Sequence, residues 1–483
     1  MRLTILWLLP FLGGIATLAG SRLSRSASRW IALAFALGSL AYSAGAVSGI
    51  ISSGPWLLAE TGGEWLFGIR YALALDGLSL ALCWLTTFLT AVSIIGSWKQ
   101  ELSAGFWACF LFLESALLGV FLAQDLFLFY IFWEAVLIPM FFIIGIWGSE
   151  GRRHAAMKFF LFTFFGSLFL LVGILALVTA QHAATGTWTW DIAALKGESA
   201  GGAAVWIFAA MALGFAVKIP LVPLHTWLPD AHTEAPAAGS IMLAGVMLKM
   251  GVYGFLRILM PIFGELAWSL MPVLGILASV NIVYGSLCAM AQSDLKRLVA
   301  YSSVAHLGFC LLGILSRSPE GVVGGSLQLI NHGLTTGALF LLVGFLYERS
   351  HRRGVADFGE LIGRAPKMTF FFGAAVFASI GLPGFNGFVG EFMSLAGMAR
   401  ALPVFALAGV VGVTLSAAYA LPAYQAVFWG QAGSQSVSAK VFDLDLRESL
   451  LLWTLVALML AIGLYPGPLL KLIEPSLVRL LAA

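Results

Sequence analysis

The chain has 483 residues, of which 60% are hydrophobic and only 10% are charged. Soluble globular domains carry about 25% charged residues, so this chain has too few polar side chains to cover a soluble fold. Its 26 basic and 23 acidic residues nearly balance, and no long basic run is present to bind phosphate groups. The composition excludes a soluble enzyme, a disordered chain and a nucleic-acid-binding protein, and it indicates an all-α polytopic membrane protein.

Runs of about 20 mainly apolar residues, the length of a membrane-crossing helix, recur along the whole chain. We predict about fourteen transmembrane helices, at 3–20, 30–50, 76–97, 105–122, 125–148, 157–180, 203–226, 236–260, 267–289, 297–316, 321–347, 367–396, 402–429 and 448–466. In the closing segment, 467–483, Lys471, Glu474 and Arg479 recur among leucines. That pattern predicts a short amphipathic helix lying on the membrane surface.

The connections suggest an orientation in the membrane. With both termini outside, most of the Lys and Arg residues in loops fall on the cytoplasmic side, as membrane proteins prefer. The outer connection 51–75 has two aromatic-bearing runs around Thr61-Gly62-Gly63-Glu64, which predicts a β-hairpin turning at those four residues.

Six of the ionisable side chains inside the predicted membrane helices are candidates for carrying protons. A charge there costs several kcal/mol by most scales and usually faces a water path or the interior of the bundle. Histidines at such positions can both accept and donate a proton near neutral pH, although a hydrogen-bonded core histidine is the alternative for each one. The candidate proton-carrying residues are Glu134, Lys218, Lys249, His306, His332 and Glu391.

Three of the six lie beside residues that interrupt a helix. Pro139 disturbs the backbone one turn earlier, next to Glu134, which we expect to pair with Lys218 across the bundle. Two prolines follow Lys218 and predict a discontinuous seventh helix. Glycines recur every third residue before Glu391 and predict a discontinuous twelfth helix. Broken membrane helices are tolerated where they line a hydrated cavity.

The polar neighbours of the other three follow helical spacing. Tyr253 and Arg257 follow Lys249 at four-residue intervals and share its face, with Arg257 as a structural anchor. Ser302 precedes His306 by four residues, and Gln328 and Thr336 flank His332 at the same spacing. Each histidine therefore lies on a polar stripe of an apolar helix.

The two discontinuous helices lie five spans apart, which is the pattern of inverted-repeat transporters. We predict two inverted five-helix repeats, helices 4–8 in 105–260 and helices 9–13 in 267–430. The N-terminal helices 1–3 occupy 1–104. The last membrane helix and the amphipathic tail occupy 447–483.

Neither the cysteines nor the histidines show the spacing of a metal site. Cys83, Cys109, Cys288 and Cys310 lie in apolar runs and are expected to be packing residues. The group His225, Asp230, His232 and Glu234 is interrupted by prolines, so a proton-entry funnel or a capping loop is favoured over a metal cluster.

Three segments of this chain resemble the antiporter-like subunits of respiratory complex I, most of all the M-type members. They are IFWEAVLIPMFFIIGIWG at 131–148, KIPLVPLHTWLPDAHTEAPAAGSIMLAGVMLKMGVYG at 218–254 and GLPGFNGFVGEF at 381–392. The resemblance covers roughly 75–467. Its implied proton path runs through the same six residues, and siblings of the M type generally carry lysine where Glu391 stands.

The resemblance implies a proton-translocating membrane-arm subunit of an NADH:quinone oxidoreductase in a bacterial inner membrane. No cofactor or metal is expected in this chain. NADH, FMN, iron–sulfur clusters and quinone are expected in partner subunits, with subunits L and N as neighbours. The alternatives are an Mrp-type cation/proton antiporter subunit, a related hydrogenase membrane subunit and a passive scaffold. Lysines in the path would repel a metal cation, and six buried ionisable groups are costly for packing alone.

Overall fold

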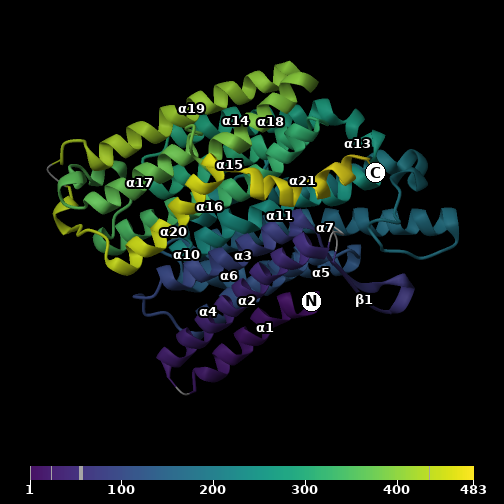
Figure 1. Cartoon of the computed structure of the whole chain (residues 1–483), viewed down its shortest axis with the longest axis horizontal. Helices are drawn as coiled ribbons and strands as arrows, with labels where there is room; N and C mark the ends of the chain where they lie inside the picture. The colour runs from purple at the N-terminus through teal and green to yellow at the C-terminus, as the bar shows by residue number, and fades with distance from the viewer. Residues whose placement is uncertain (1, 23, 54–57, 434–435, 483) are drawn as a thin grey trace.

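The computed structural model describes residues 2–22, 24–53, 58–433 and 436–482. Long helices run side by side in one bundle, from α1 and α2 at one edge to α19 at the opposite edge (Figure 1). Thirteen helices of the described chain are long and apolar enough to cross a membrane. The expected twelfth span is divided into two shorter helices, α17 and α18, and so is not counted among the thirteen. The predicted all-α membrane fold is confirmed.

The N-terminal half contains the chain from α1 to the eighth span, which is built of alternating α and π turns. Its helices are α1 (Leu3–Gly20), α2 (Arg25–Ser53), α3 (Gly77–Gly96), α4 (Ala104–Leu122), α5 (Leu126–Ala135), α6 (Leu137–Trp147), α7 (Arg152–Thr185), α8 (Ala204–Lys218), α9 (Trp227–Glu234), α10 (Ala237–Met242), η3 (Leu243–Met247), α11 (Leu248–Gly254), η4 (Phe255–Leu259) and α12 (Met260–Phe263). Two short 3₁₀ turns, η1 (Leu66–Gly68) and η2 (Gly197–Ala203), lie in the connections.

The C-terminal half also consists mainly of long helices joined by short connections. Its helices are α13 (Glu265–Ser269), α14 (Met271–Met290), α15 (Leu295–Ile314), α16 (Pro319–Ser350), α17 (Pro366–Ser379), α18 (Asn386–Ala401), α19 (Pro403–Phe428), α20 (Leu446–Leu464) and α21 (Gly467–Ala482), with 3₁₀ turns η5 (Val355–Asp357), η6 (Leu361–Gly363) and η7 (Ser438–Lys440).

Aspartates mark where several membrane helices begin. The carboxylates of Asp76, Asp125, Asp294 and Asp445 accept hydrogen bonds from backbone N–H groups in the first turns of α3, α5, α15 and α20. The first N–H groups of a helix have no partner within it, so a short acidic side chain satisfies them and fixes the starting residue.

The expected helix breaks are present. One follows Ala135, where α5 ends and α6 begins. The second follows Lys218, at the end of α8. The third separates α17 from α18, where Gly381 and Gly384 adopt left-handed φ values of 71° and 96° that glycine accepts without strain. The eighth span differs from the regular helix that we expected, because the π turns η3 and η4 interrupt it on either side of Lys249.

The outer hairpin forms, but its turn is not where the sequence suggested. Strands β1 (Leu58–Glu64) and β2 (Arg70–Leu75) pair antiparallel, with Leu58 opposite Leu75 and Glu64 opposite Arg70. The turn is therefore at 65–69. Gly62 and Gly63, which were expected to form the turn, lie instead in β1, where the pairing is irregular. The left-handed φ values of Phe67 and Gly68, 56° and 76°, reverse the chain at this point.

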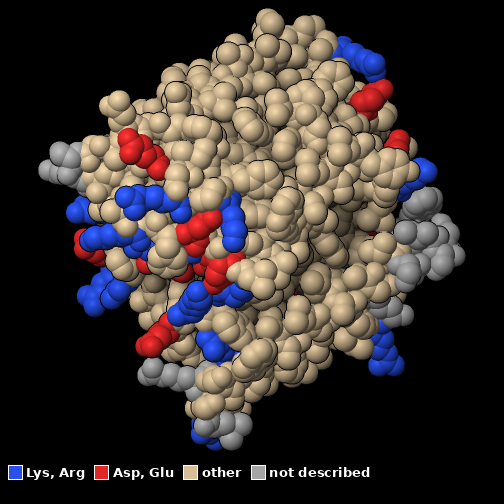
Figure 2. Space-filling model, turned by 60° about the vertical axis from the view of Figure 1, so that its left-hand side comes forward, with Lys and Arg blue, Asp and Glu red and all other residues tan. Residues whose placement is uncertain are grey.

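Charged side chains gather at one end of the bundle, beside a wide surface without charge (Figure 2). A wide uncharged surface of this kind is typical of the part of a membrane protein that is covered by lipid. The amphipathic α21 packs on α3 and α16 through Ile473, Ser476 and Leu477, which are buried. Its expected position on the membrane surface stays a prediction.

Candidate functional site

Four of the six candidate residues form a nearly continuous polar chain inside the bundle. Lys249 Nζ lies 2.6 Å from His332 Nδ1. The rings of His332 and His306 are 5.5 Å apart between centroids. His306 Nδ1 then lies 3.1 Å from Glu391 Oε1. All four side chains are at most 4% exposed, so this chain of groups is shielded from solvent along its length.

Four different helices bring these residues together. Lys249 is on α11, His332 near the middle of α16, His306 on α15 and Glu391 on α18. Lys249 Nζ also donates to the carbonyl of Ala244, which lies in the π turn η3 just before the lysine. The widened backbone thus holds the lysine toward α16, a use of π turns that is frequent at functional sites.

A small cavity lies between the two histidines. It is lined by side chains that the helical spacing singled out, among them Ser302, Gln328 and Thr336, and it leaves about 10 Å³ for the centre of a water molecule. That is about the room one water requires. The Gln328 amide also donates to Glu391 Oε1 over 3.1 Å, and Ser379 Oγ lies 3.3 Å from His306 Nε2.

The other two candidates lie apart from this chain and are not bonded to each other. Lys218 is 1% exposed, and its Nζ lies 5.1 Å from the centre of the Trp133 ring. It has no hydrogen-bond partner among the described residues. The Glu134 carboxylate interacts with Lys218 electrostatically without a contact within 4 Å. The expected pair is therefore a through-space interaction and not a direct ion pair.

The sequence alone did not give the order of the groups along the path. The two histidines lie between Lys249 and Glu391. His306 and Glu391 are in direct contact. Helical periodicity shows which residues share a face, but it does not show which helix packs next to that face.

Asparagines brace both broken helices, and the sequence analysis missed them. In the gap after α8, the Val222 N–H donates to Asn281 Oδ1 over 2.7 Å, and Asn281 Nδ2 reaches the carbonyls of Pro220 and Val304. At the start of α18, Asn331 Nδ2 donates to the Asn386 carbonyl over 2.7 Å, and Asn386 Nδ2 donates back to the Asn331 carbonyl. The sequence feature that could have indicated them is an asparagine within a mainly apolar membrane helix.

Three further polar groups lie within the bundle. Arg257 forms an ion pair of 2.7 Å with Asp76, which agrees with its expected anchoring role, and Tyr253 OH donates to the Phe121 carbonyl. Glu114 on α4 was missed by the sequence analysis. It is fully buried and interacts with the Ser39 side chain.

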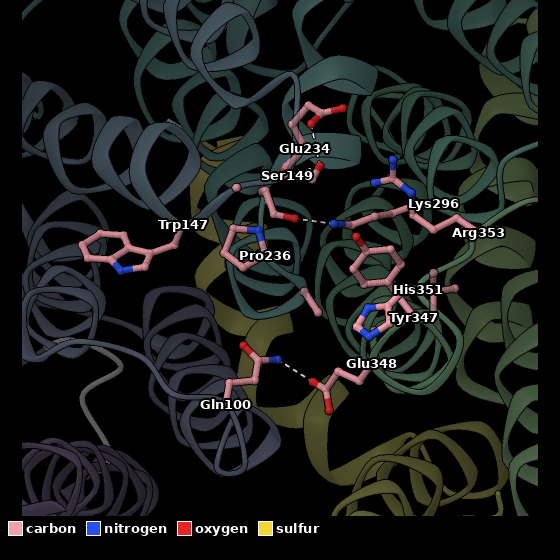
Figure 3. A pocket seen from close by; sticks show the side chains of 15 residues that line it. Gln100, Trp147, Ser149, Glu234, Pro236, Lys296, Tyr347, Glu348, His351 and Arg353 are labelled. Carbon is pink, nitrogen blue, oxygen red and sulfur yellow. Dashed lines mark hydrogen bonds between the residues drawn. The ribbon is translucent and has the colours of Figure 1, made fainter. Parts of the chain in front are cut away.

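A pocket of about 310 Å³ opens at the charged end of the bundle (Figure 3). Glu348, which accepts a hydrogen bond from Gln100, lines one side of it, and Glu234, which accepts one from Ser149 Oγ, lines the other. Lys296 donates to the Ala235 carbonyl at its wall. His232 is buried behind this wall, within electrostatic range of both Lys296 and Lys249.

The side chains of the group His225, Asp230, His232 and Glu234 do not point to a common centre. Asp230 pairs with Lys158 at 2.6 Å and Glu234 bonds to Ser149 and Gly151. His232 stacks on Phe340, and His225 lies against Tyr284. Within the described chain no three His, Cys, Asp or Glu residues are placed to hold a metal ion. The four cysteines are unpaired.

Comparison with known proteins relates this architecture to a single family. Residues 123–416 match the family model described as NADH:quinone oxidoreductase/Mrp antiporter, TM. NADH-quinone oxidoreductase subunit M of Rhodobacter capsulatus is 41% identical over 99% of this chain and 96% of its own length. The Escherichia coli K12 protein of the same name is 39% identical over 97% of this chain and 96% of its own.

Solved structures agree with this relationship. A chain of respiratory complex I from Thermus thermophilus with bound NADH has 32% identity and a TM-score of 0.87, with both chains covered completely. A chain of the Mrp complex from Dietzia sp. has a TM-score of 0.88 at 21% identity, over 100% of this chain and 98% of that one, and shows the fold alone. The protein therefore belongs to the NADH-quinone oxidoreductase subunit M family, within the larger group of antiporter-like membrane subunits.

Proposed function

We propose that this chain is the proton-translocating subunit M of a bacterial NADH:quinone oxidoreductase. The observation that carries the proposal is the buried chain of groups from Lys249 through His332 and His306 to Glu391. Each member can hold and release a proton. Their near-complete burial would be costly in a purely structural role, and such a route is what proton transport across an apolar barrier requires.

The transfer steps follow from the atoms that face one another. Lys249 Nζ releases a proton to His332 Nδ1, and the imidazole gives up its other ring proton from Nε2 into the small cavity. One water there can carry the proton on to His306. His306 then donates from Nδ1 to the Glu391 carboxylate. Each histidine accepts on one nitrogen and releases from the other, so its net charge is restored but its tautomer is exchanged. The ring must return to its first tautomer before it carries the next proton.

The pocket of Figure 3 is the proposed entrance. Its carboxylates and Lys296 can exchange protons with bulk water, and His232 interacts electrostatically with both Lys296 and Lys249. Glu134 and Lys218 form the proposed switch. Moving one charge against 100 mV costs about 2.3 kcal/mol, so a partner that alters the Glu134–Lys218 interaction by that amount can drive release from the neighbouring lysine.

The electrons must come from elsewhere in the assembly. We expect NADH, FMN, iron–sulfur clusters and quinone in partner subunits, and subunits L and N as lateral neighbours. The support is the assembly to which the similar chain belongs, a complex I with bound NADH. We place the protein in the inner membrane with both termini periplasmic, which puts the charged end of Figure 2 in the cytoplasm.

The orientation can be tested with single cysteines in inner-membrane vesicles. Residues in 349–366 should react with an impermeant maleimide only from the cytoplasmic side, and residues in 181–201 only from the periplasmic side. Labelling in the opposite sense would invert the proposed direction of transport.

The route itself is tested with Lys249→Met in vesicles that oxidise NADH. We expect acidification, followed with a pH-sensitive dye and normalised to assembled complex, to be largely lost. Lys196→Met, in an exposed outer loop, is the matched control and should behave as the parent protein. Full acidification by the Lys249 variant would refute the route.

Cation/proton exchange is the second candidate, because the family model covers Mrp antiporters and the Mrp chain shares the fold. The same vesicles distinguish the two functions. An imposed sodium or potassium gradient should cause no pH change without NADH, and a change abolished by Lys249→Met would favour the antiporter.

A further inference from the structure

A pocket with both aromatic and charged walls opens where α2 begins and α3 ends. We call it the headgroup pocket, of about 680 Å³, lined by Ser26, Arg29, Trp98, Lys99, Gln100, Glu101, Leu102 and Trp107. It adjoins the entrance pocket, because Gln100 lines both, and it contains none of the six candidate proton-carrying residues. Trp30, 58% exposed, packs edge-on against Trp98 beside it. Tryptophans at such a level are typical of the boundary between lipid tails and headgroups.

Arg29 is held in this pocket with unused hydrogen-bonding capacity. Its guanidinium lies 4.3 Å from the centre of the Trp98 ring, and Nη1 donates to the Trp98 carbonyl over 2.5 Å. Its Nε is enclosed by protein atoms, so a ligand in the pocket would be bound by the Nη groups at the end of the side chain. The guanidinium fork that carries them matches the geometry of a phosphate group.

A second, almost wholly apolar groove of about 580 Å³ lies on the same helices, between α2 and α20 and over α3. We call it the tail groove. Its walls are Leu37, Leu40, Ala41, Ala44, Trp84, Phe88, Thr454, Ala457 and Leu458. The rings of Trp84 and Phe88 stack with an interplanar angle of 5°, which makes a flat floor.

The groove and the pocket lie along one line. On α2, Arg29, Leu33, Leu37 and Ala41 follow at four-residue intervals and so share a side of the helix. Leu33 is half-buried, as is Ile95, which precedes Lys99 by four residues on α3. At a rise of about 1.5 Å per residue, the tail groove lies roughly 12–22 Å deeper than Arg29, the depth reached by acyl chains in a hydrocarbon core about 30 Å thick.

The charges around the headgroup pocket almost cancel. Lys99 is paired with Asp445 at 2.7 Å. Burial acts to raise the pKa of Asp445, but the Glu448 N–H and the Lys99 and Arg447 cations outweigh it and lower that pKa. Arg29 is then the cation left for a ligand, and the exposed Glu101 is the nearby anion.

We propose that the headgroup pocket and the tail groove together bind one phosphatidylethanolamine-type phospholipid. Its phosphate is bound by Arg29, its ammonium group faces Glu101 and an acyl chain fills the tail groove. A helix of a partner protein would fill the groove but would leave the Arg29 fork unused. An anionic lipid would leave Glu101 without a counterpart, so a zwitterionic lipid fits the charges better.

Native mass spectrometry of the purified, delipidated complex tests this, with titration of phosphatidylethanolamine or phosphatidylglycerol in mixed micelles. We expect one ethanolamine lipid to bind in preference to the glycerol lipid. Arg29→Gln should weaken that binding about tenfold, the loss of a charge-assisted contact, and Arg29→Lys should recover part of it. Arg22→Gln, at an exposed site outside the pocket, is the control and should bind as the parent.

A second variant separates binding from folding. Ala41→Phe keeps every charge and fills the tail groove, so it should also weaken ethanolamine-lipid binding while the complex stays assembled. Unchanged binding in both Arg29→Gln and Ala41→Phe would overturn the site, and equal or tighter binding of the glycerol lipid would overturn its zwitterionic character. A photoreactive residue at Leu37 should cross-link lipid in membranes, and a cross-link to polypeptide would assign the groove to a partner protein.

Discussion

The region around Lys218 and the region around His332 are both buried, but their ionisable groups are joined in different ways. Lys218 lies over the Trp133 ring and reaches Glu134 only through space. Lys249 and Glu391, in contrast, are each in direct contact with a histidine. Hydrogen bonds define a path for a proton, while a through-space interaction only changes the free energy of a charge. The two regions thus suit different tasks, switching in the first and transfer in the second.

The largest effect is expected in the switching region, where no second group can replace the lost charge. Lys218→Ala should lower coupled electron transfer by at least about tenfold, since positioned acid–base groups commonly contribute about 10²–10⁴-fold. Turnover would be measured as NADH oxidation in vesicles, normalised to assembled complex. Glu134→Ala should act alike and Glu134→Asp more mildly.

The control for this comparison is Lys367→Ala, at an exposed position at the start of α17, which should leave turnover unchanged. If Lys218→Ala instead removes the whole complex from the membrane, the lysine is structural and the switching role fails.

The next effect belongs to the transfer region. Glu391→Ala removes the last acceptor of the chain and should abolish most acidification, whereas Glu391→Lys should retain a measurable part. The protein already uses a lysine–histidine contact at Lys249 and His332, so a lysine at 391 can meet His306 in the same way. Repulsion from a second charge opposes this, at about 4 kcal/mol for 4 Å and an effective dielectric near 20.

Dye quenching in vesicles ranks the two variants at position 391. Equal loss in both would mean that the negative charge is required, and the transfer scheme would have to end at a carboxylate.

Sequence reasoning located the charges better than it located their partners. Composition and apolar runs were enough to predict the spans, and prolines and glycines were enough to place the breaks after Lys218 and before Glu391. The Lys249–His332 contact joins residues far apart in the chain. Such contacts depend on which helices become neighbours, and periodicity along one helix holds no information on that. The π turns and the position of the hairpin turn were not predicted for a related reason. Tertiary packing selects them over a regular α-helix and over a turn at the glycines.

Smaller effects should separate the two broken helices. Asn281→Ala removes the acceptor of the Val222 N–H and the contacts to two carbonyls, and a buried unsatisfied group costs about 1–3 kcal/mol. Asn331→Ala removes contacts on one side of a mutual pair that also involves the Asn386 side chain, so its cost should be lower. The thermal melting temperature of the purified complex measures both.

Ser279→Ala is the matched control, because it lies on the same helix as Asn281 and its hydroxyl has no partner in the described chain. Its melting temperature should equal that of the parent. A larger fall in melting temperature for Asn331→Ala than for Asn281→Ala would show that Asn331 contributes more to stability, contrary to this expectation.

The smallest effect concerns the Trp133 ring, which lies beside the Lys218 ammonium group. Trp133→Phe keeps an aromatic face over the ammonium group but loses the N–H that donates to Ser167 over 3.0 Å. Trp133→Leu loses the aromatic face as well. A desolvated cation–π contact contributes about 2 kcal/mol, which is more than tenfold in an equilibrium, so the leucine variant should reduce turnover several-fold and the phenylalanine variant about twofold. Trp188→Leu in an outer connection is the control. If the leucine variant pumped as well as the parent, the ring would be a packing residue, and the through-space interaction of Glu134 with Lys218 would account for the switch without it.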